Sequence, residues 1–246
     1  MGKKYFTLSF DDGLEQDKKI IALMKKYALK GTFNLNAGLF GTYGEVKGIG
    51  TFAFQDLEQG TKHAWPFSYV PHNRIPKSEI LEVYKGMEIA SHSYKHEALG
   101  RIPAGKMKES IDRDLKELEA LTDQKIEGHA YASGSVSEET MNYLNKKGIL
   151  YARGAFPGNS FEFPDNPLNY NPTNAIANAK TLQLIEKFKK AEAGDKDLLL
   201  FLWGHGYEFD YGKKYHNWTF LEQVFNVIAG EDDIIYCTNR DAFLHI

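Results

Sequence analysis

The chain has 246 residues, of which 42% are hydrophobic and 26% are charged, as is typical of a folded globular protein. Its formal net charge of −3 gives no global electrostatic reason to bind nucleic acid or an anionic membrane, and we expect neither partner. The single cysteine, Cys237, excludes an internal disulfide. The first residues hold too few apolar side chains for a signal peptide, which predicts a cytoplasmic protein, or an extracellular or cell-envelope one if a leader has been removed.

Short β-rich runs alternate with helical patterns along the chain. The runs predicted as strands span residues 5–10, 31–38, 87–91, 126–132, 149–154, 197–203 and 233–238. Most are apolar, which is typical of strands buried on both faces of a parallel sheet. Apolar residues recur at helical spacing over residues 20–28, 111–121, 182–188 and 221–228. We therefore predict a single α/β domain over residues 1–246, a deformed (β/α)7-type barrel with mostly parallel strands.

Turn signals mark one further helix and two long loops. Ser135 and Glu138 have the spacing of a capping box before ETMNYLNKKG, and Gly148 is expected to end that helix. The segments at about 39–76, rich in glycine and aromatics, and 156–174, rich in proline and asparagine, do not follow the alternation. Loops this long in a compact domain are usually functional or disordered, and the aromatic content argues against disorder.

Two adjacent carboxylates, Asp11 and Asp12, follow the first predicted strand. Catalytic groups of parallel α/β domains gather at the carboxyl ends of strands. Because successive strand residues point to opposite sides, we expect these carboxylates to diverge toward different walls of a pocket. This disfavours a glycosidase pair, whose carboxyls face each other across a sugar. It favours a metal ligand beside a base.

Three histidines follow later predicted strands. His92 and His96 are four residues apart, a spacing that would place both rings on one side of a helical turn and let them share an ion. Ser93 stands where a zincin would have glutamate, so that motif is absent. His205 lies just past the strand at 197–203. Each feature alone is usually structural, but together at three strand ends they predict a metal-dependent site.

The motifs SFDDG, SHSYKH and LWGH, in this order, resemble those of the polysaccharide deacetylase family (NodB homology, carbohydrate esterase family 4). The resemblance implies a deformed barrel, an acetylated carbohydrate or amino-sugar substrate, and a divalent metal, usually zinc, with cobalt, nickel or iron as alternatives. It implies that Asp12, His92 and His96 are metal ligands. It also implies that Asp11 is the general base and His205 the general acid. Three protein ligands would leave positions for water and the acetyl carbonyl.

The third motif of the family often reads Arg-Pro-Pro-Tyr-Gly, and this chain has AYASG instead. Tyr131 and Ser133 in this segment are candidates for contact with the substrate or its oxyanion. Arg153, at the end of the next predicted strand, is a candidate by position for the missing arginine. Trp203, which neighbours the last histidine, is a candidate for a sugar-stacking or acetyl-pocket residue.

The surroundings of His205 depart from the family once more. Gly206 stands where an acidic residue often follows, and Glu208 or Asp210 is close enough in sequence to replace it. Without such a partner, the pKa of His205 would be lower and its capacity to donate a proton weaker. The remaining histidines and nearby aromatic residues are interpreted as structural, as packing residues or as pocket wall: His63, His72, His129, His216, His245, Trp65, Tyr207 and Trp218.

Three other functions stay open beside an N-acetyl-directed carbohydrate deacetylase. The altered third motif is compatible with a catalytically weak or inactive carbohydrate-binding relative. Two histidines and one carboxylate also describe the facial triad of non-haem iron oxygenases, although Asp11 and His205 favour hydrolysis. The same groups could hydrolyse the C–N amide bond of a small molecule.

Overall fold

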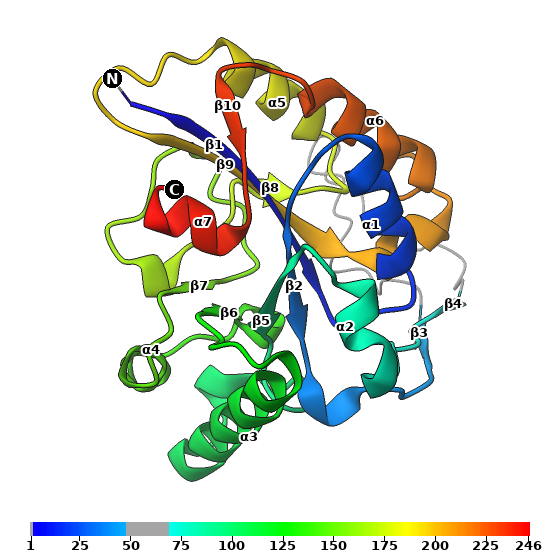
Figure 1. The fold of residues 1–246 in the computed structure, drawn as a ribbon, viewed down its shortest axis with the longest axis vertical. Coiled ribbons are helices and arrows are strands. Elements are labelled where there is room, and N and C mark those ends of the chain that lie inside the picture. Colours follow the sequence, from blue (N-terminus) through cyan, green and yellow to red (C-terminus); the bar gives the residue numbers. More distant parts are fainter. Residues whose placement is uncertain (1, 48–68) are drawn as a thin grey trace, which may run out of the picture.

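One parallel sheet organises the chain, for which the computed structural model describes residues 2–47 and 69–246. Its strands are β1 (Lys4–Asp11), β2 (Thr32–Leu35), β5 (Glu88–Ser91), β6 (Gly128–Ala130), β7 (Tyr151–Arg153), β8 (Asn174–Ala175), β9 (Leu198–His205) and β10 (Ile234–Tyr236). They lie in the order β7-β6-β5-β2-β1-β9-β8, with β10 paired to β1, and each pair is parallel (Figure 1). The predicted α/β domain, with a curled, mostly parallel sheet of the deformed-barrel type, is confirmed.

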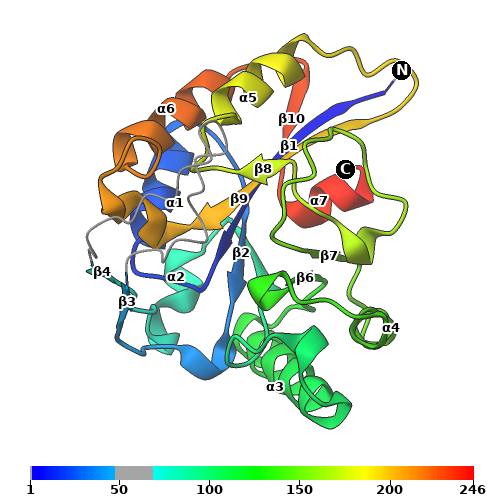
Figure 2. The same ribbon diagram turned by 180° about the vertical axis from the view of Figure 1, so that it is seen from behind.

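Helices flank this sheet on its outside, apart from the last one, which packs against the inner face of β1. They are α1 (Asp17–Lys26), α2 (Ile80–Val83), α3 (Ala104–Thr122), α4 (Glu138–Lys146), α5 (Thr181–Lys190), α6 (Trp218–Ile228) and α7 (Asn239–Leu244). In both views α1, α6 and α5 follow one another along one flank (Figures 1 and 2). Their apolar stripes are buried against the sheet, as the sequence periodicity predicts. Among the described residues, no helix has the length and apolarity needed to cross a bilayer.

β1 is buried along its whole length, and its two faces differ in chemistry. Phe6, Leu8 and Phe10 belong to the main apolar core under the helices. Ser9 belongs to the alternate set, which faces the inside of the curled sheet. Its hydroxyl lies within hydrogen-bond distance of side-chain nitrogens from three other parts of the chain: Asn34, Arg153 and Asn239. The inner face of β1 is therefore a polar column that ends at Asp11.

The register of β1 with its neighbours brings the predicted site residues to one edge. Asp11 pairs with His205 of β9 on one side and with Asn34 of β2 on the other. Ser91, the last residue of β5, pairs with Leu35 at the end of β2. The residues that follow these strands consequently meet at the carboxyl edge of the sheet, as the alternation of elements predicts.

The two segments predicted as long loops contain short strands. Residues 39–76 include an antiparallel hairpin of β3 (Glu45–Lys47) and β4 (Tyr69–Pro71), while His63 and Trp65 lie outside the described residues. The segment 156–174 carries a 3₁₀ turn at Pro167–Asn169 and leads into β8. Strands of two or three residues hold too little alternation to be recognised in a sequence.

The N-cap of α4 is Ser137, so the predicted capping box of Ser135 and Glu138 is wrong. The hydroxyl of Ser137 accepts a hydrogen bond from the amide of Thr140 at 3.2 Å. The helix starts at Glu138 itself, which places this residue at the first helical position rather than the third. Gly148, with φ +84°, follows the end of the helix as predicted.

Removing this cap is expected to destabilise the protein. Ser137→Ala leaves an amide at the start of α4 without its acceptor, and we expect the free energy of unfolding to fall by about 1 kcal/mol. Ser135→Ala leaves the cap intact and is expected to cost less than about 0.5 kcal/mol. Urea unfolding of both variants measures the difference, and equal losses would contradict this assignment of the cap.

Candidate active site

A cavity of about 380 Å³ lies at the carboxyl ends of β1, β5 and β9. All the site residues predicted from the sequence line it except Arg153, which lies behind Asp11. The lining residues are Asp11, Asp12, His72, Arg74, His92, His96, Tyr131, Ser133, Ala155, Trp203, His205 and Tyr207. We call this space the carboxyl-end cavity.

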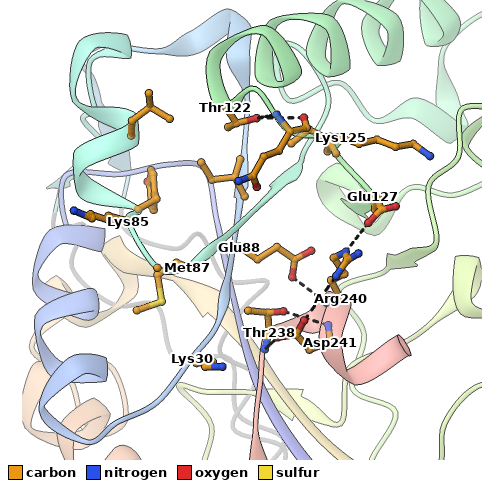
Figure 3. Close-up of a pocket in the computed structure, with 16 residues that line it drawn as sticks. Lys30, Lys85, Met87, Glu88, Thr122, Lys125, Glu127, Thr238, Arg240 and Asp241 are labelled. Carbon is orange, nitrogen blue, oxygen red and sulfur yellow. Dashed lines mark hydrogen bonds and ion pairs between the residues drawn. The ribbon is translucent and has the colours of Figure 1, made fainter. Parts of the chain in front are cut away.

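A larger cavity of about 780 Å³ lies at the opposite edge, near the amino ends of β2, β5 and β6 (Figure 3). Glu88 at its floor accepts hydrogen bonds from the hydroxyls of Thr32 and Tyr151 and from the amide of Arg240. Glu127 is paired with the Arg240 guanidinium. The carboxylates of Glu88 and Glu127 are thus already engaged, which favours a structural role for this cavity.

Asp11 forms a buried ion pair with Arg153. The Arg153 side chain is fully buried, and its Nε donates to Ser9 Oγ at 3.1 Å. Asn34 Nδ2 donates to the same Asp11 oxygen at 2.9 Å. Burial would raise the pKa of Asp11, but the charge of Arg153 and the neighbouring imidazoles hold it below the ordinary value. Asp11 is therefore ionised at neutral pH and held in one orientation by the arginine that the sequence suggests by position.

Asp12 lies just beyond the end of β1 with φ +81°, a strained backbone conformation for a residue with a side chain. Because Asp12 has left the strand, its carboxylate does not diverge from that of Asp11, and the expectation of different walls is wrong. Both carboxylates face one point, since His92 Nε2 lies 3.9 Å from Asp11 Oδ2 and 3.9 Å from Asp12 Oδ1.

His92 and His96 lie on an irregular turn after β5 rather than on the predicted helical turn. Ser93 and His96 have φ values of +66° and +59°, which no helix contains. The two rings nevertheless approach edge to face, with centroids 4.9 Å apart. Asp114 of α3 supports the start of this turn by accepting hydrogen bonds from Ser91 Oγ at 2.6 Å and from the His92 amide at 3.3 Å.

The donor atoms of Asp12, His92 and His96 suit a divalent cation. His92 Nδ1 must donate to the Ala130 carbonyl, 2.8 Å away, which leaves the Nε2 lone pair free, and this buried atom has no partner among the described residues. His96 Nε2 lies 3.7 Å from Asp12 Oδ1, and one ligand atom from each residue falls within 4.8 Å of the others. Tetrahedral zinc needs ligand atoms about 3.3–3.5 Å apart. Burial and the neighbouring His92 lower the pKa of His96 to about 4, so its ring is neutral, as a ligand must be.

His205 is paired with Glu208, one of the two carboxylates predicted as its partner. Its Nδ1 lies 2.8 Å from Glu208 Oε1, while its Nε2 faces the cavity, 3.9 Å from Asp11 Oδ2. Asp210, the other candidate, instead accepts hydrogen bonds from Gln16 and Trp218. Burial would lower the pKa of His205, but the hydrogen bond and charge of Glu208 and the site carboxylates raise it to about 9. The imidazole is therefore protonated at neutral pH.

The remaining predicted residues form the wall of the cavity. Tyr131 donates its hydroxyl to Leu168 O at 2.7 Å and its amide to Arg153 O at 2.9 Å, so its ring is what it offers to a substrate. Ser133 adopts φ +56° beside it. The ring of Trp203 lies 4.9 Å from the guanidinium carbon of Arg153, and its buried Nε1 has no partner among the described residues. A substrate contact through any of these residues stays a prediction.

His72 and Arg74 also line the cavity. The sequence predicts only a structural role for His72 and gives no prediction for Arg74. Both contact Asp12, and His72 Nε2 lies 3.0 Å from Asp12 Oδ2. They follow β4, a three-residue strand that has no recognisable pattern in the sequence. The only available signal was the glycine- and aromatic-rich composition of residues 39–76, which predicted a functional loop without indicating which side chains it supplies.

Replacing Glu208 should lower the pKa of His205. In metal-free Glu208→Gln the charge that favours the imidazolium is lost, and we expect a ring pKa well below the wild-type value of about 9. Because the folded pKa exceeds the ordinary value of 6.5, this pair stabilises the fold fully below pH 6.5, and the contribution is lost as pH rises through about 9. NMR titration of the imidazole measures the shift. Asp210→Asn is the matched control, and an equal shift there would refute the pairing.

Removing Arg153 should destabilise the protein, because the buried carboxylate of Asp11 would lose its counter-charge. Arg153→Met is expected to lower the free energy of unfolding by about 3–5 kcal/mol at pH 7. The loss should shrink on acidification, because without the arginine burial raises the pKa of Asp11, so the carboxyl of the variant takes up a proton and no longer carries an uncompensated charge. Urea unfolding at pH 7 and pH 4 tests this. Arg240→Met, at a guanidinium that is 41% exposed, is the control, and should cost about 1 kcal/mol or less.

Solved structures that align with a TM-score above 0.5 share this fold. The chain aligns with a putative polysaccharide deacetylase from Mycobacterium smegmatis at 14% identity and a TM-score of 0.58, covering 100% of this chain and 90% of that one. It aligns with the carbohydrate esterase family 4 pseudoenzyme BA3943 from Bacillus anthracis at 17% identity and a TM-score of 0.52, covering 92% and 59%. For the Streptococcus pyogenes deacetylase PplD in complex with acetate, the identity is 18%, the TM-score 0.48 and the coverage 66% and 61%. The chain thus spans about three fifths of the length of the latter two proteins.

The family comparison covers the first part of the chain. No curated protein matches this chain significantly. The profile described as polysaccharide deacetylase matches residues 1–152, which include Asp11, Asp12, His92 and His96 but not His205. This match extends over more than half of the sequence, and the chain therefore belongs to the polysaccharide deacetylase family.

Proposed function

We propose that this protein is a metal-dependent hydrolase that removes N-acetyl groups from a carbohydrate. The observation that carries the proposal is the convergence of three arrangements on one cavity. They are the buried, unpartnered Nε2 of His92 beside Asp12 and His96, the Asp11–Arg153 pair, and the His205–Glu208 pair. Each supplies one requirement of amide hydrolysis: a cation site, a base and an acid.

Asp12, His92 and His96 would hold the cation, and zinc suits their one oxygen and two nitrogen donors. When bound, a divalent cation supplies polarisation of the acetyl carbonyl and a lowered pKa for a water molecule. Imidazole ligands accept several divalent metals, so cobalt, nickel or iron would also fit these donors.

Asp11 is suited to act as the general base. It is ionised, its Oδ1 is held by Arg153 and Asn34, and its Oδ2 lies 3.9 Å from both His92 Nε2 and His205 Nε2. Oδ2 is therefore the oxygen that faces the cavity, where it can accept a proton from the attacking water. The arginine fixes the orientation of this carboxylate before the substrate arrives.

His205 is suited to act as the general acid. Glu208 holds its Nδ1, which leaves the Nε2 proton directed into the cavity. Protonation by His205 would convert the departing nitrogen into a neutral amine. An amine anion is a far poorer leaving group than an alkoxide, so a protonated imidazole matters most for an N-acetyl group. This favours N-acetyl over O-acetyl substrates.

Aromatic surface at the cavity favours a sugar ring. Trp203 and Tyr207 line the wall, and Tyr207 is stacked on the ring of His205 with centroids 5.0 Å apart. Phe156, next to the lining residue Ala155, is 64% exposed. An exposed aromatic ring beside a polar cavity offers an apolar platform to the hydrogen-bearing face of a sugar. We therefore prefer an acetylated carbohydrate to a small-molecule amide.

The alternatives differ in what they need from these residues. A binding protein needs neither base nor acid, and the pseudoenzyme among the structural neighbours is a reminder that this fold alone does not decide catalysis. The paired states of Asp11 and His205 favour a catalyst. An iron oxygenase would use the same Asp12, His92 and His96 set but has no use for a proton donor such as His205.

The direct test is acetate release by zinc-loaded protein from N-acetylated chito-oligosaccharides. We expect turnover that a chelator abolishes and that Zn²⁺ or Co²⁺ restores. Asp11→Asn should lower kcat by about 100-fold or more while zinc affinity changes by less than about 3-fold, because the base is not a ligand. Asp12→Asn should lose both turnover and zinc affinity. The exposed Asp195→Asn is the matched control and should behave as wild type.

Three results would count against the proposal. Failure of the zinc-loaded protein on both acetylated amino-sugars and acetylated xylan would exclude a carbohydrate deacetylase. Undiminished turnover in Asp11→Asn would refute the assignment of Asp11 as the general base. Consumption of oxygen by Fe(II)-loaded protein would favour the oxygenase.

A further inference from the structure

Two side chains outside the predicted ligand set hold the carboxylate of Asp12. His72 and Arg74 follow β4, on the hairpin that the sequence analysis treated as a loop. We propose that His72, supported by Arg74, is a positioning residue that aims one oxygen of Asp12 at the cation and thereby sets metal affinity. The inference rests on the proposed metal site and names residues that control it.

The two oxygens of Asp12 have different partners. Oδ2 lies 3.0 Å from His72 Nε2. Oδ1 lies 3.5 Å from Arg74 Nη2, 3.7 Å from His96 Nε2 and 3.9 Å from His92 Nε2. A carboxylate turns easily about its Cβ–Cγ bond, so a hydrogen bond to Oδ2 selects the rotation in which Oδ1 faces the two imidazoles. Mutation of a residue that hydrogen-bonds a metal ligand typically lowers metal affinity by about 10–100-fold.

Arg74 fixes which nitrogen of His72 carries the proton. A guanidinium can only donate, and Arg74 Nη1 lies 3.5 Å from His72 Nδ1. Nδ1 is therefore the acceptor, and the proton of the neutral ring is on Nε2, where it donates to Asp12.

The hairpin is anchored where this contact requires it. The amide of Ile75 donates to Gly13 O at 2.9 Å, and the amide of Glu15 donates to Asn73 O at 2.9 Å. Arg74 Nε donates to the backbone oxygen of Asp12 at 3.2 Å. These bonds tie the residues around His72 to the turn that carries the strained Asp12 backbone, so the imidazole approaches from a fixed position.

Zinc affinity tests the role without reference to turnover. Apo protein is titrated with Zn²⁺ in competition with a chromogenic chelator. His72→Leu should raise the zinc Kd by about 10–100-fold. His72→Gln should stay within about 3-fold of wild type, because its amide nitrogen can donate to Oδ2 in place of the ring. His245→Leu, at a half-exposed histidine paired with Asp197, is the matched control and should not change zinc affinity.

Two spectroscopic measurements accompany the titration. The visible absorption of Co²⁺-loaded His72→Leu should differ from that of wild type, because the Asp12 carboxylate would be free to rotate. Nitrogen NMR shifts of metal-free wild type should show the His72 proton on Nε2. Thermal unfolding identifies a variant that fails to fold, and His72→Ala, which also cannot donate to Asp12 Oδ2, then replaces His72→Leu.

The outcomes separate this inference from the proposed function. Wild-type zinc affinity in folded His72→Leu, or a proton on Nδ1, would overturn the positioning role and leave the metal site standing. A His72→Gln variant as weak as His72→Leu would show that the ring itself is required, which also overturns it. Absence of zinc binding in wild type would overturn both proposals.

Discussion

The site depends on the alternation of side chains along β1. Its even-numbered positions place Phe6, Leu8 and Phe10 in the apolar core, and this burial leaves the strand no freedom to slip by one residue. The alternate positions must then face the inside of the curled sheet. Ser9 and Asp11 lie in this column, and the parallel register sets Asp11 beside His205 of β9. The packing of these three apolar side chains thus decides where the carboxylate of Asp11 lies.

Three ionisable groups of the site are each held by a partner side chain, two of them by residues distant in the sequence and His205 by a residue of the turn that follows it. Asp11 is held by Arg153, Asp12 by His72, and His205 by Glu208. A buried carboxylate without such a partner would take up a proton at neutral pH, and a buried imidazole would lose one. The partners therefore set, before a substrate binds, the protonation states that the proposed hydrolysis requires. The strained backbone of Asp12 is tolerated because Arg74 and the hairpin that carries it hold this backbone in place.

Sequence reasoning located what long, regular elements position and missed what short, irregular ones supply. The eight-residue strands β1 and β9 have strong apolar patterns, and β5, although only four residues long, was predicted within residues 87–91, so the residues after all three could be placed at one edge of the sheet. His72 and Arg74 follow a three-residue strand paired only within a hairpin, and no periodicity reveals it. The directions of Asp11 and Asp12 could not be predicted either, because strand alternation stops where the positive φ of Asp12 begins. The predicted N-cap of α4, Ser135, is two residues away from the observed one, Ser137, because the start of a helix depends on local backbone geometry.

The substitution in the third motif has a geometric explanation. Ala130 stands where relatives often carry arginine, and Ala130 is the register partner of Arg153 on the neighbouring strand β7. Partners in adjacent strands lie only about 5 Å apart, and an arginine side chain is long enough to span that displacement. β7 is four strands away from β1 in the sheet, and the guanidinium of Arg153 reaches Asp11 across the inside of the curled sheet, passing Ser9, which its Nε contacts at 3.1 Å. The small side chain of Ala130 leaves room for this approach. What the structure shows is the contact itself, in which a buried arginine supplied by β7 holds the carboxylate of Asp11.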